Sequence, residues 1–83
     1  MTDNTYDNRI SIQQLCDDAS AQALEVARNS HALRLLVVTN ELKAARWVAE
    51  ELYWDEVKFN GGGGDWNRQI YGLMIEAVQE AVR

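Results

Sequence analysis

The 83-residue chain has no proline, one cysteine and one histidine. Proline breaks helix interiors, so a chain built of helices can omit it, whereas loop-rich and sandwich folds rarely do. Cys16 has no second cysteine with which to form a disulfide inside the chain. Cys16 and His31 alone are too few for a structural zinc site, which takes four such ligands. A core this small therefore depends on close helix packing or on a second subunit.

Long apolar runs and excess positive charge are also missing. No apolar run approaches the roughly 18 residues of a membrane-spanning helix, and the polar, acidic first eight residues are not the pattern of a signal peptide. An unpaired cysteine suits a reducing compartment, so we expect a cytoplasmic protein with no membrane contact. The formal net charge of −5 disfavours direct nucleic-acid binding, because phosphate contacts need Lys and Arg.

The first helix is predicted over residues 11–29. Ser11, with Gln14 three residues later, matches a capping box. One face of this helix carries apolar residues three and four positions apart, Ile12, Leu15, Ala19, Ala23 and Val26. Residues 1–9 have turn-forming residues and no apolar period, so we expect a frayed or disordered arm there. Ser30 is a candidate cap for the next helix.

A long central helix is predicted over residues 31–58. Its core face is a heptad-like seam that keeps its phase across Asn40: Leu35, Val38, Leu42, Ala45, Ala49 and Leu52. In the alternative, residues 33–39 and 57–60 are strands, and Asn40 caps a helix between them. The helix is the preferred interpretation, because two strands are too few for a parallel sheet.

Four consecutive glycines, at positions 61–64, separate the central helix from the last one. A glycine run before a helix can bind phosphate through backbone N–H groups. Here the Lys and Ser/Thr of a P-loop are lacking, and Asp65 places a carboxylate where the phosphate would lie. We therefore expect residues 60–64 to be a Gly-rich hinge, with Asp65 capping a helix over 65–83.

The apolar residues of the last helix spread over about 200° of its circumference, about twice the width of an ordinary apolar stripe. Such a helix lies between two neighbours or forms a subunit interface. We expect a homodimer whose interface comprises Tyr71, Met74, Ile75, Val78 and Val82. The fold class predicted for residues 1–83 is all-α, a single three-helix domain with one long central helix.

No arrangement typical of an enzyme is present. Cys16 and His31 lie about four helical turns apart, and the adjacent acidic pairs point about 100° apart, so neither makes a carboxylate dyad. We therefore expect no catalysis, no cofactor and no bound metal.

An aromatic stripe is the strongest candidate for a binding site. Trp47 and Trp54 are seven residues apart, so they align on the side of the central helix opposite the seam. Trp is enriched at binding hot spots. The alternative is that neighbouring helices bury both indoles. The predicted partner-binding residues are Trp47, Trp54, Lys43, Glu50, Glu51 and Asp55.

The expected function is a small protein–protein interaction module. Its general profile, short, acidic, helical and without an enzymatic motif, is similar to that of many phage and mobile-element proteins that block host machinery by binding it, anti-CRISPR proteins among them. This likeness gives no residue a role. One alternative is an acidic nucleic-acid mimic that blocks a basic groove. The other is a protein that binds a small ligand or phosphate through the glycine run.

Overall fold

The computed structural model describes residues 11–83, which form helices without any strand. The elements are α2 (Ile12–Arg28), α3 (His31–Val38), α4 (Leu42–Leu52), the short π-helix η1 (Tyr53–Val57) and α5 (Gly63–Ala81). The all-α class is therefore confirmed for this part of the chain, and the two-strand alternative is wrong. The predicted arm, residues 1–9, lies outside the described residues.

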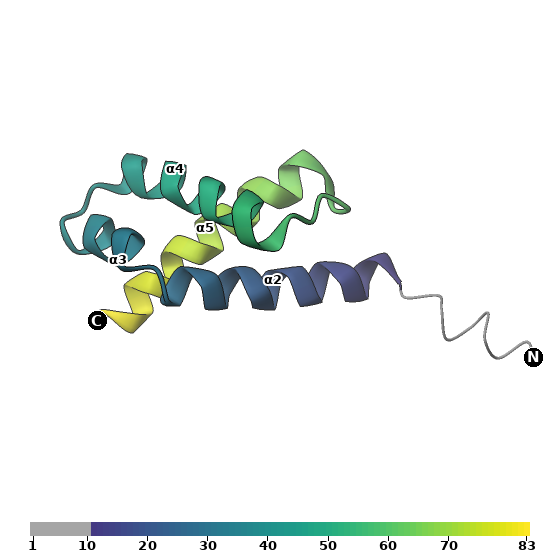
Figure 1. Ribbon diagram of the computed structural model, residues 1–83, viewed down its shortest axis with the longest axis horizontal. Coiled ribbons are helices and arrows are strands. Elements are labelled where there is room, and N and C mark those ends of the chain that lie inside the picture. The colour runs from purple at the N-terminus through teal and green to yellow at the C-terminus, as the bar shows by residue number, and fades with distance from the viewer. Residues whose placement is uncertain (1–10) are drawn as a thin grey trace, which may run out of the picture.

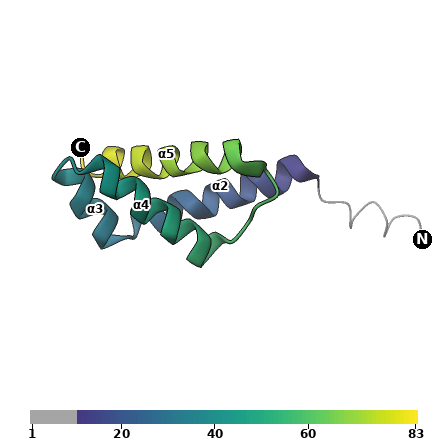
Figure 2. The same cartoon turned by 90° about the horizontal axis from the view of Figure 1, so that it is seen from above.

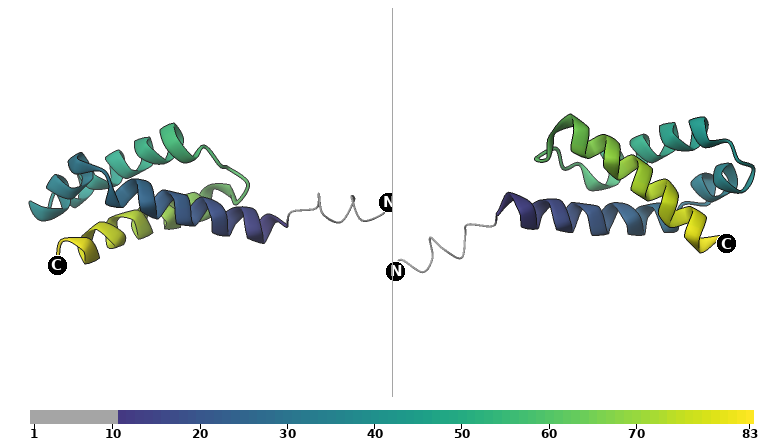
Figure 3. Two further views of the ribbon diagram at one scale, coloured as in Figure 1. Left: turned by 60° about the horizontal axis from the view of Figure 1, so that its bottom comes forward. Right: turned by 180° about the vertical axis from the view of Figure 1, so that it is seen from behind.

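The helix at the centre of the molecule is α5. It passes obliquely behind α2 and α4 (Figure 1) and packs against α2, α3 and α4. The view from above places α5 along one side of α2 and α4 (Figure 2), and the view from behind shows it crossing α2 obliquely (Figure 3). The largest fully buried side chains come from α3, η1 and α5: Tyr53, Leu33, Ile70, Met74 and Val78.

The first helix begins as predicted. The Ser11 hydroxyl accepts a hydrogen bond from the backbone N–H of Gln14 at 3.0 Å, which satisfies a donor that the helix leaves free. Ser30 caps α3 in the same way, through the N–H of Leu33. The buried face of α2 consists of small residues, Ala19, Ala23 and Ala27, so α5 can approach its backbone closely.

The predicted continuous helix over 31–58 is wrong, because the chain turns between α3 and α4. Asn40 adopts a left-handed conformation with φ 62°, which asparagine tolerates better than most residues. The N–H of Asn40 donates to the carbonyl of Val37, and that of Glu41 to the carbonyl of Leu36. These two bonds make a Schellman motif, which satisfies the last carbonyls of α3 and ends it.

This break divides the predicted seam into an exposed half and a buried half. Ala45 and Ala49 are buried and Leu52 is partly buried. The part before and at the break is exposed instead, at Leu35, Val38 and Leu42. The residues that α3 buries are Leu33 and Val37, since the turn changes the rotation of α3 relative to α4.

Aromatic rings pack on the first two residues of the glycine run, the segment predicted to be a Gly-rich hinge. The rings of Phe59 and Trp66 meet edge to face, with centroids 5.7 Å apart. A Cβ on Gly61 would collide with the Phe59 ring, and one on Gly62 would lie 2.6 Å from the Trp66 ring. A side chain at either position would therefore force an aromatic ring to move, because the rings lie directly on the backbone.

The last helix starts earlier than predicted. It begins at Gly63, after Gly62 as the N-cap residue, so Asp65 lies in its first turn and is not the cap. Two hydrogen bonds hold the preceding loop: the hydroxyl of Tyr53 donates to the carbonyl of Phe59, and the amide of Asn67 donates to the Asn60 side chain at 2.9 Å.

The wide apolar arc of α5 is accounted for within one chain. Because α5 contacts three other helices, Tyr71, Met74 and Val78 are buried, and Ile75 and Val82 pack against the core. The prediction that these five residues form a subunit interface is corrected accordingly: three of them have no surface to offer a second copy. Homodimerisation itself stays a prediction, and the arc no longer supports it.

Candidate protein-binding surface

The outward face of α4 is fixed by what α4 buries. Ala45 and Ala49 are fully buried, and Tyr53, the first residue of η1, continues this line at the same spacing of four. Side chains two residues away on a helix point to roughly the opposite side. Trp47 therefore faces away from α5, and the aromatic stripe predicted from the sequence lies at the surface rather than in the core.

Trp47 is the most exposed large apolar side chain in the described part of the chain, with 72% of its surface accessible. Water solvates an indole poorly, and Trp side chains bury a large area when a partner covers them. Trp47 is thus available for an interaction that the described chain itself does not supply.

Trp54 is held in place more firmly. It lies in the π-helical turn that follows α4 and is 37% exposed. Its indole N–H donates to the Tyr71 hydroxyl on α5 at 2.9 Å, and its ring meets that of Tyr53 edge to face, with centroids 5.1 Å apart. The indole is therefore fixed against α5, and one part of the ring remains open to solvent.

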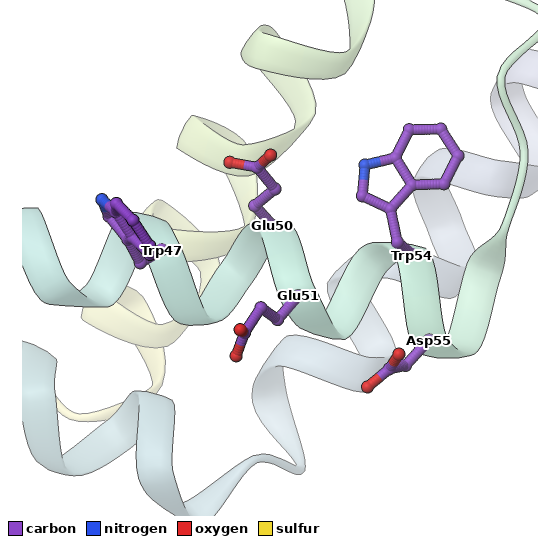
Figure 4. Close-up of a pocket in the computed structure, with 5 residues that line it drawn as sticks. All are labelled: Trp47, Glu50, Glu51, Trp54 and Asp55. Carbon is purple, nitrogen blue, oxygen red and sulfur yellow. The ribbon is translucent and has the colours of Figure 1, made fainter.

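The two indoles and three carboxylates line one shallow hollow. Figure 4 shows Trp47 and Trp54 at its two ends, with Glu50 on one side of the helix and Glu51 and Asp55 on the other. A second hollow adjoins Trp47 and is lined in part by Lys43 and Glu51. All six predicted partner-binding residues thus gather on one surface, here named the Trp47 face: Trp47, Trp54, Lys43, Glu50, Glu51 and Asp55.

Within residues 11–83, the carboxylates of the Trp47 face form no ion pair. Within residues 11–83 the ion pairs are Arg68–Asp65 and Arg83–Glu80, both exposed and both on or next to α5. Arg46, four residues before Glu50, lines a neighbouring hollow together with Glu50, Trp54 and Arg68, but within residues 11–83 it forms no ion pair with Glu50. Its guanidinium donates to the carbonyl of Arg68 at 3.2 Å and lies 5.9 Å from the centre of the Tyr71 ring. The Trp47 face therefore combines open apolar surface with carboxylates that form no ion pair in the described part of the chain.

No protein-family model, curated protein or solved structure matches this chain.

The other candidate residues from the sequence, Cys16 and His31, do not lie close enough to form a site. Cys16 is half-buried on α2, and His31 is exposed at the start of α3, so most of α2, roughly 20 Å of helix, lies between them. In the described ranges no group of three or more His, Cys, Asp or Glu side chains could hold a metal ion. Nor is any helix between residues 11 and 83 long and apolar enough to cross a membrane.

Among residues 11–83, Tyr53 is the one ionisable group whose pKa is strongly perturbed, and its role is structural. Burial raises the pKa of Tyr53 from 10.0 to about 12, because the phenolate would lose its solvation; Tyr71 and Cys16 nearby add to the shift. The hydroxyl donates to the carbonyl of Phe59. Tyr53 thus links the start of η1 to the loop that precedes α5.

Sequence reasoning missed part of this surface. Glu41, Ala44 and Val48 line the second hollow beside Trp47. Ala44, three residues before Trp47, could have been found from helical spacing alone. The bond from Trp54 to Tyr71 could not, because it depends on how α5 crosses α4.

Proposed function

We propose that the protein is a small protein–protein interaction module that binds its partner through the Trp47 face. One observation carries the proposal: a tryptophan with 72% of its surface exposed, beside a second, half-open tryptophan on the same hollow. Covering that indole would contribute roughly 2–4 kcal/mol to binding, from the apolar area removed from water. This is the size of effect expected of an interface hot spot.

The module is proposed to act by binding, without catalysis. Support comes from the surroundings of its candidate groups: Cys16 and His31 are far apart, and the perturbed Tyr53 is a hydrogen-bonded core residue. A reducing compartment such as the cytoplasm suits its unpaired cysteine. The wider proposal, an inhibitor carried by a phage or a mobile element, rests on the general profile of the chain.

The two alternative functions have less support. Phosphate binding at the glycine run is disfavoured, because aromatic rings lie on Gly61 and Gly62 and because Asp65 occupies the first turn of α5. A nucleic-acid mimic needs carboxylates and no exposed indole. The position of Trp47 at the hollow therefore favours a protein partner.

A pull-down tests the proposal. The full chain, Trp47→Ala and Ile12→Ala are immobilised, and the proteins that each captures from a lysate of the source organism are quantified. Ile12→Ala is the matched control, because Ile12 is also a large exposed apolar residue but lies on α2. We expect a protein that the native chain and Ile12→Ala retain and that Trp47→Ala loses by at least about tenfold. Equal capture by all three would contradict the proposal.

A further inference from the structure

The carboxylates of the Trp47 face are arranged at a cost to the free protein. Glu51 and Asp55 are four residues apart, and like charges at this spacing repel each other and destabilise a helix. Glu50 adds a third negative charge to the same hollow. Lys43 lines one adjoining hollow, and Arg46 and Arg68 line another together with Glu50, yet in the described part of the chain none of these cations forms an ion pair with the three carboxylates. The repulsion would be relieved by a cation that enters from outside.

The indole rings also favour binding of a cationic group. The face of a Trp ring attracts ammonium and guanidinium groups more strongly than any other aromatic side chain. Trp47 is open enough to accept one, while the N–H of Trp54 is already bonded to Tyr71. What Trp54 offers to a partner is therefore ring surface. One such contact already exists within the chain, because the guanidinium of Arg46 lies beside the ring of Tyr71.

We propose that the partner presents a basic segment to the Trp47 face, with Lys or Arg side chains lying between the two indoles and against Glu50, Glu51 and Asp55. This inference rests on the proposed function and specifies the chemistry of its partner. Seven residues separate the indoles, roughly 10 Å along the helix axis. A helical segment of about seven residues, or an extended one of about three, spans that distance. The aromatic anchors provide apolar contact and the carboxylates provide selection for charge.

A peptide selection tests the charge of the partner. A displayed library of random peptides is selected on the full chain and counter-selected on Trp47→Ala, so that only peptides that need Trp47 remain. We expect the remaining peptides to be enriched in Lys and Arg and to bind more weakly as salt rises from about 50 to about 300 mM, because their charges become screened. Neutral or acidic peptides that need Trp47 would overturn the basic partner and leave the interaction module standing. A library that yields no peptide dependent on Trp47 would overturn both.

A charge-neutral variant tests whether the three carboxylates of the Trp47 face contribute to peptide binding. Each selected peptide is titrated against the triple variant Glu50→Gln, Glu51→Gln and Asp55→Asn, and we expect its dissociation constant to rise on the order of tenfold.

The matched control removes the same charges elsewhere, at exposed positions on α2 and α5: Asp18→Asn, Glu25→Gln and Glu76→Gln. This triple variant should bind each peptide within about twofold of the native chain. An equal loss of affinity in both triple variants would show that only net charge matters, and would overturn the assignment of the basic segment to the Trp47 face.

Discussion

The two sides of α4 differ in a way that inverts the usual relation between side-chain size and burial. The inner side buries two alanines, Ala45 and Ala49, before Tyr53 closes it, whereas the outer side exposes Trp47. Small side chains let the backbone of α4 approach its neighbours, and a close-packed interior leaves no space there for an indole. Trp47 is therefore not a core residue that has been left outside the core. Four experiments test whether the inner side stabilises the fold and the outer side does not.

The largest expected effect is on the buried side, at Tyr53. Its ring is fully buried and contacts the rings of Trp54, Trp66 and Tyr71. Replacing it by Ala leaves a cavity and removes the bond to the carbonyl of Phe59, so we expect a loss of about 3–5 kcal/mol in unfolding free energy. Urea unfolding followed by circular dichroism measures it. A loss below about 1.5 kcal/mol would mean that Tyr53 is not central to the core.

The next effect concerns the close approach of α4. Ala49→Leu places three extra carbon atoms where no surface is exposed, and such overpacking costs about 1–3 kcal/mol. The control is Ala44→Leu, which makes the same change on the exposed side of the same helix. We expect that variant to stay within about 0.5 kcal/mol of the native chain. Equal effects in urea unfolding would contradict the assignment of the two sides.

The sequence predicts the parts of this fold that depend on local chemistry. Ser11 and Ser30 are predictable caps because each hydroxyl accepts a hydrogen bond from an N–H only three residues away. The break at Asn40 also had a local signal, since Asn adopts the left-handed conformation that ends a helix. That signal was outweighed by the continuing phase of Leu35 and Val38, which the structure leaves exposed. A regular apolar spacing predicts a face, but it cannot say whether a neighbour covers that face.

The candidate surface was also predictable only in part. The spacing of Trp47 and Trp54 places them on one stripe, and the structure keeps both on one hollow. Their unequal exposure was not predictable, because the bond from Trp54 to Tyr71 depends on the path of α5. The same holds for Arg46, whose guanidinium donates to the carbonyl of Arg68 on α5 and forms no ion pair with Glu50.

The third effect is a dependence of stability on alkaline pH. The Tyr53 phenol of the unfolded chain titrates near 10, whereas the folded chain holds its pKa at about 12. Between these values the unfolded state binds fewer protons, so the unfolding free energy falls as the pH rises, by about 1.4 kcal/mol at pH 11 relative to neutral pH. Urea unfolding at several pH values measures this fall.

Tyr53→Phe is the control for the alkaline effect. The variant has no phenol at this position, so its unfolding free energy should lack this part of the dependence on pH. The phenolate absorbance of the folded native chain should also show one of its three tyrosines titrating well above the ordinary range. A slope that is the same in both proteins would assign the pH dependence to other groups.

The smallest expected change in stability is at Trp47, where the change in binding should be largest. Trp47→Ala removes a mostly exposed ring, and Ala is the better helix former by about 0.5 kcal/mol. We expect the unfolding free energy to stay constant or to rise by up to about that amount, while partner binding is lost. Trp54→Phe, which removes the bond to Tyr71, should cost about 1 kcal/mol. If Trp47→Ala destabilised the chain as much as Trp54→Phe does, Trp47 would support the fold. A stable Trp47→Ala that no longer binds would instead identify Trp47 as a residue retained for its partner, at some expense to the helix that carries it.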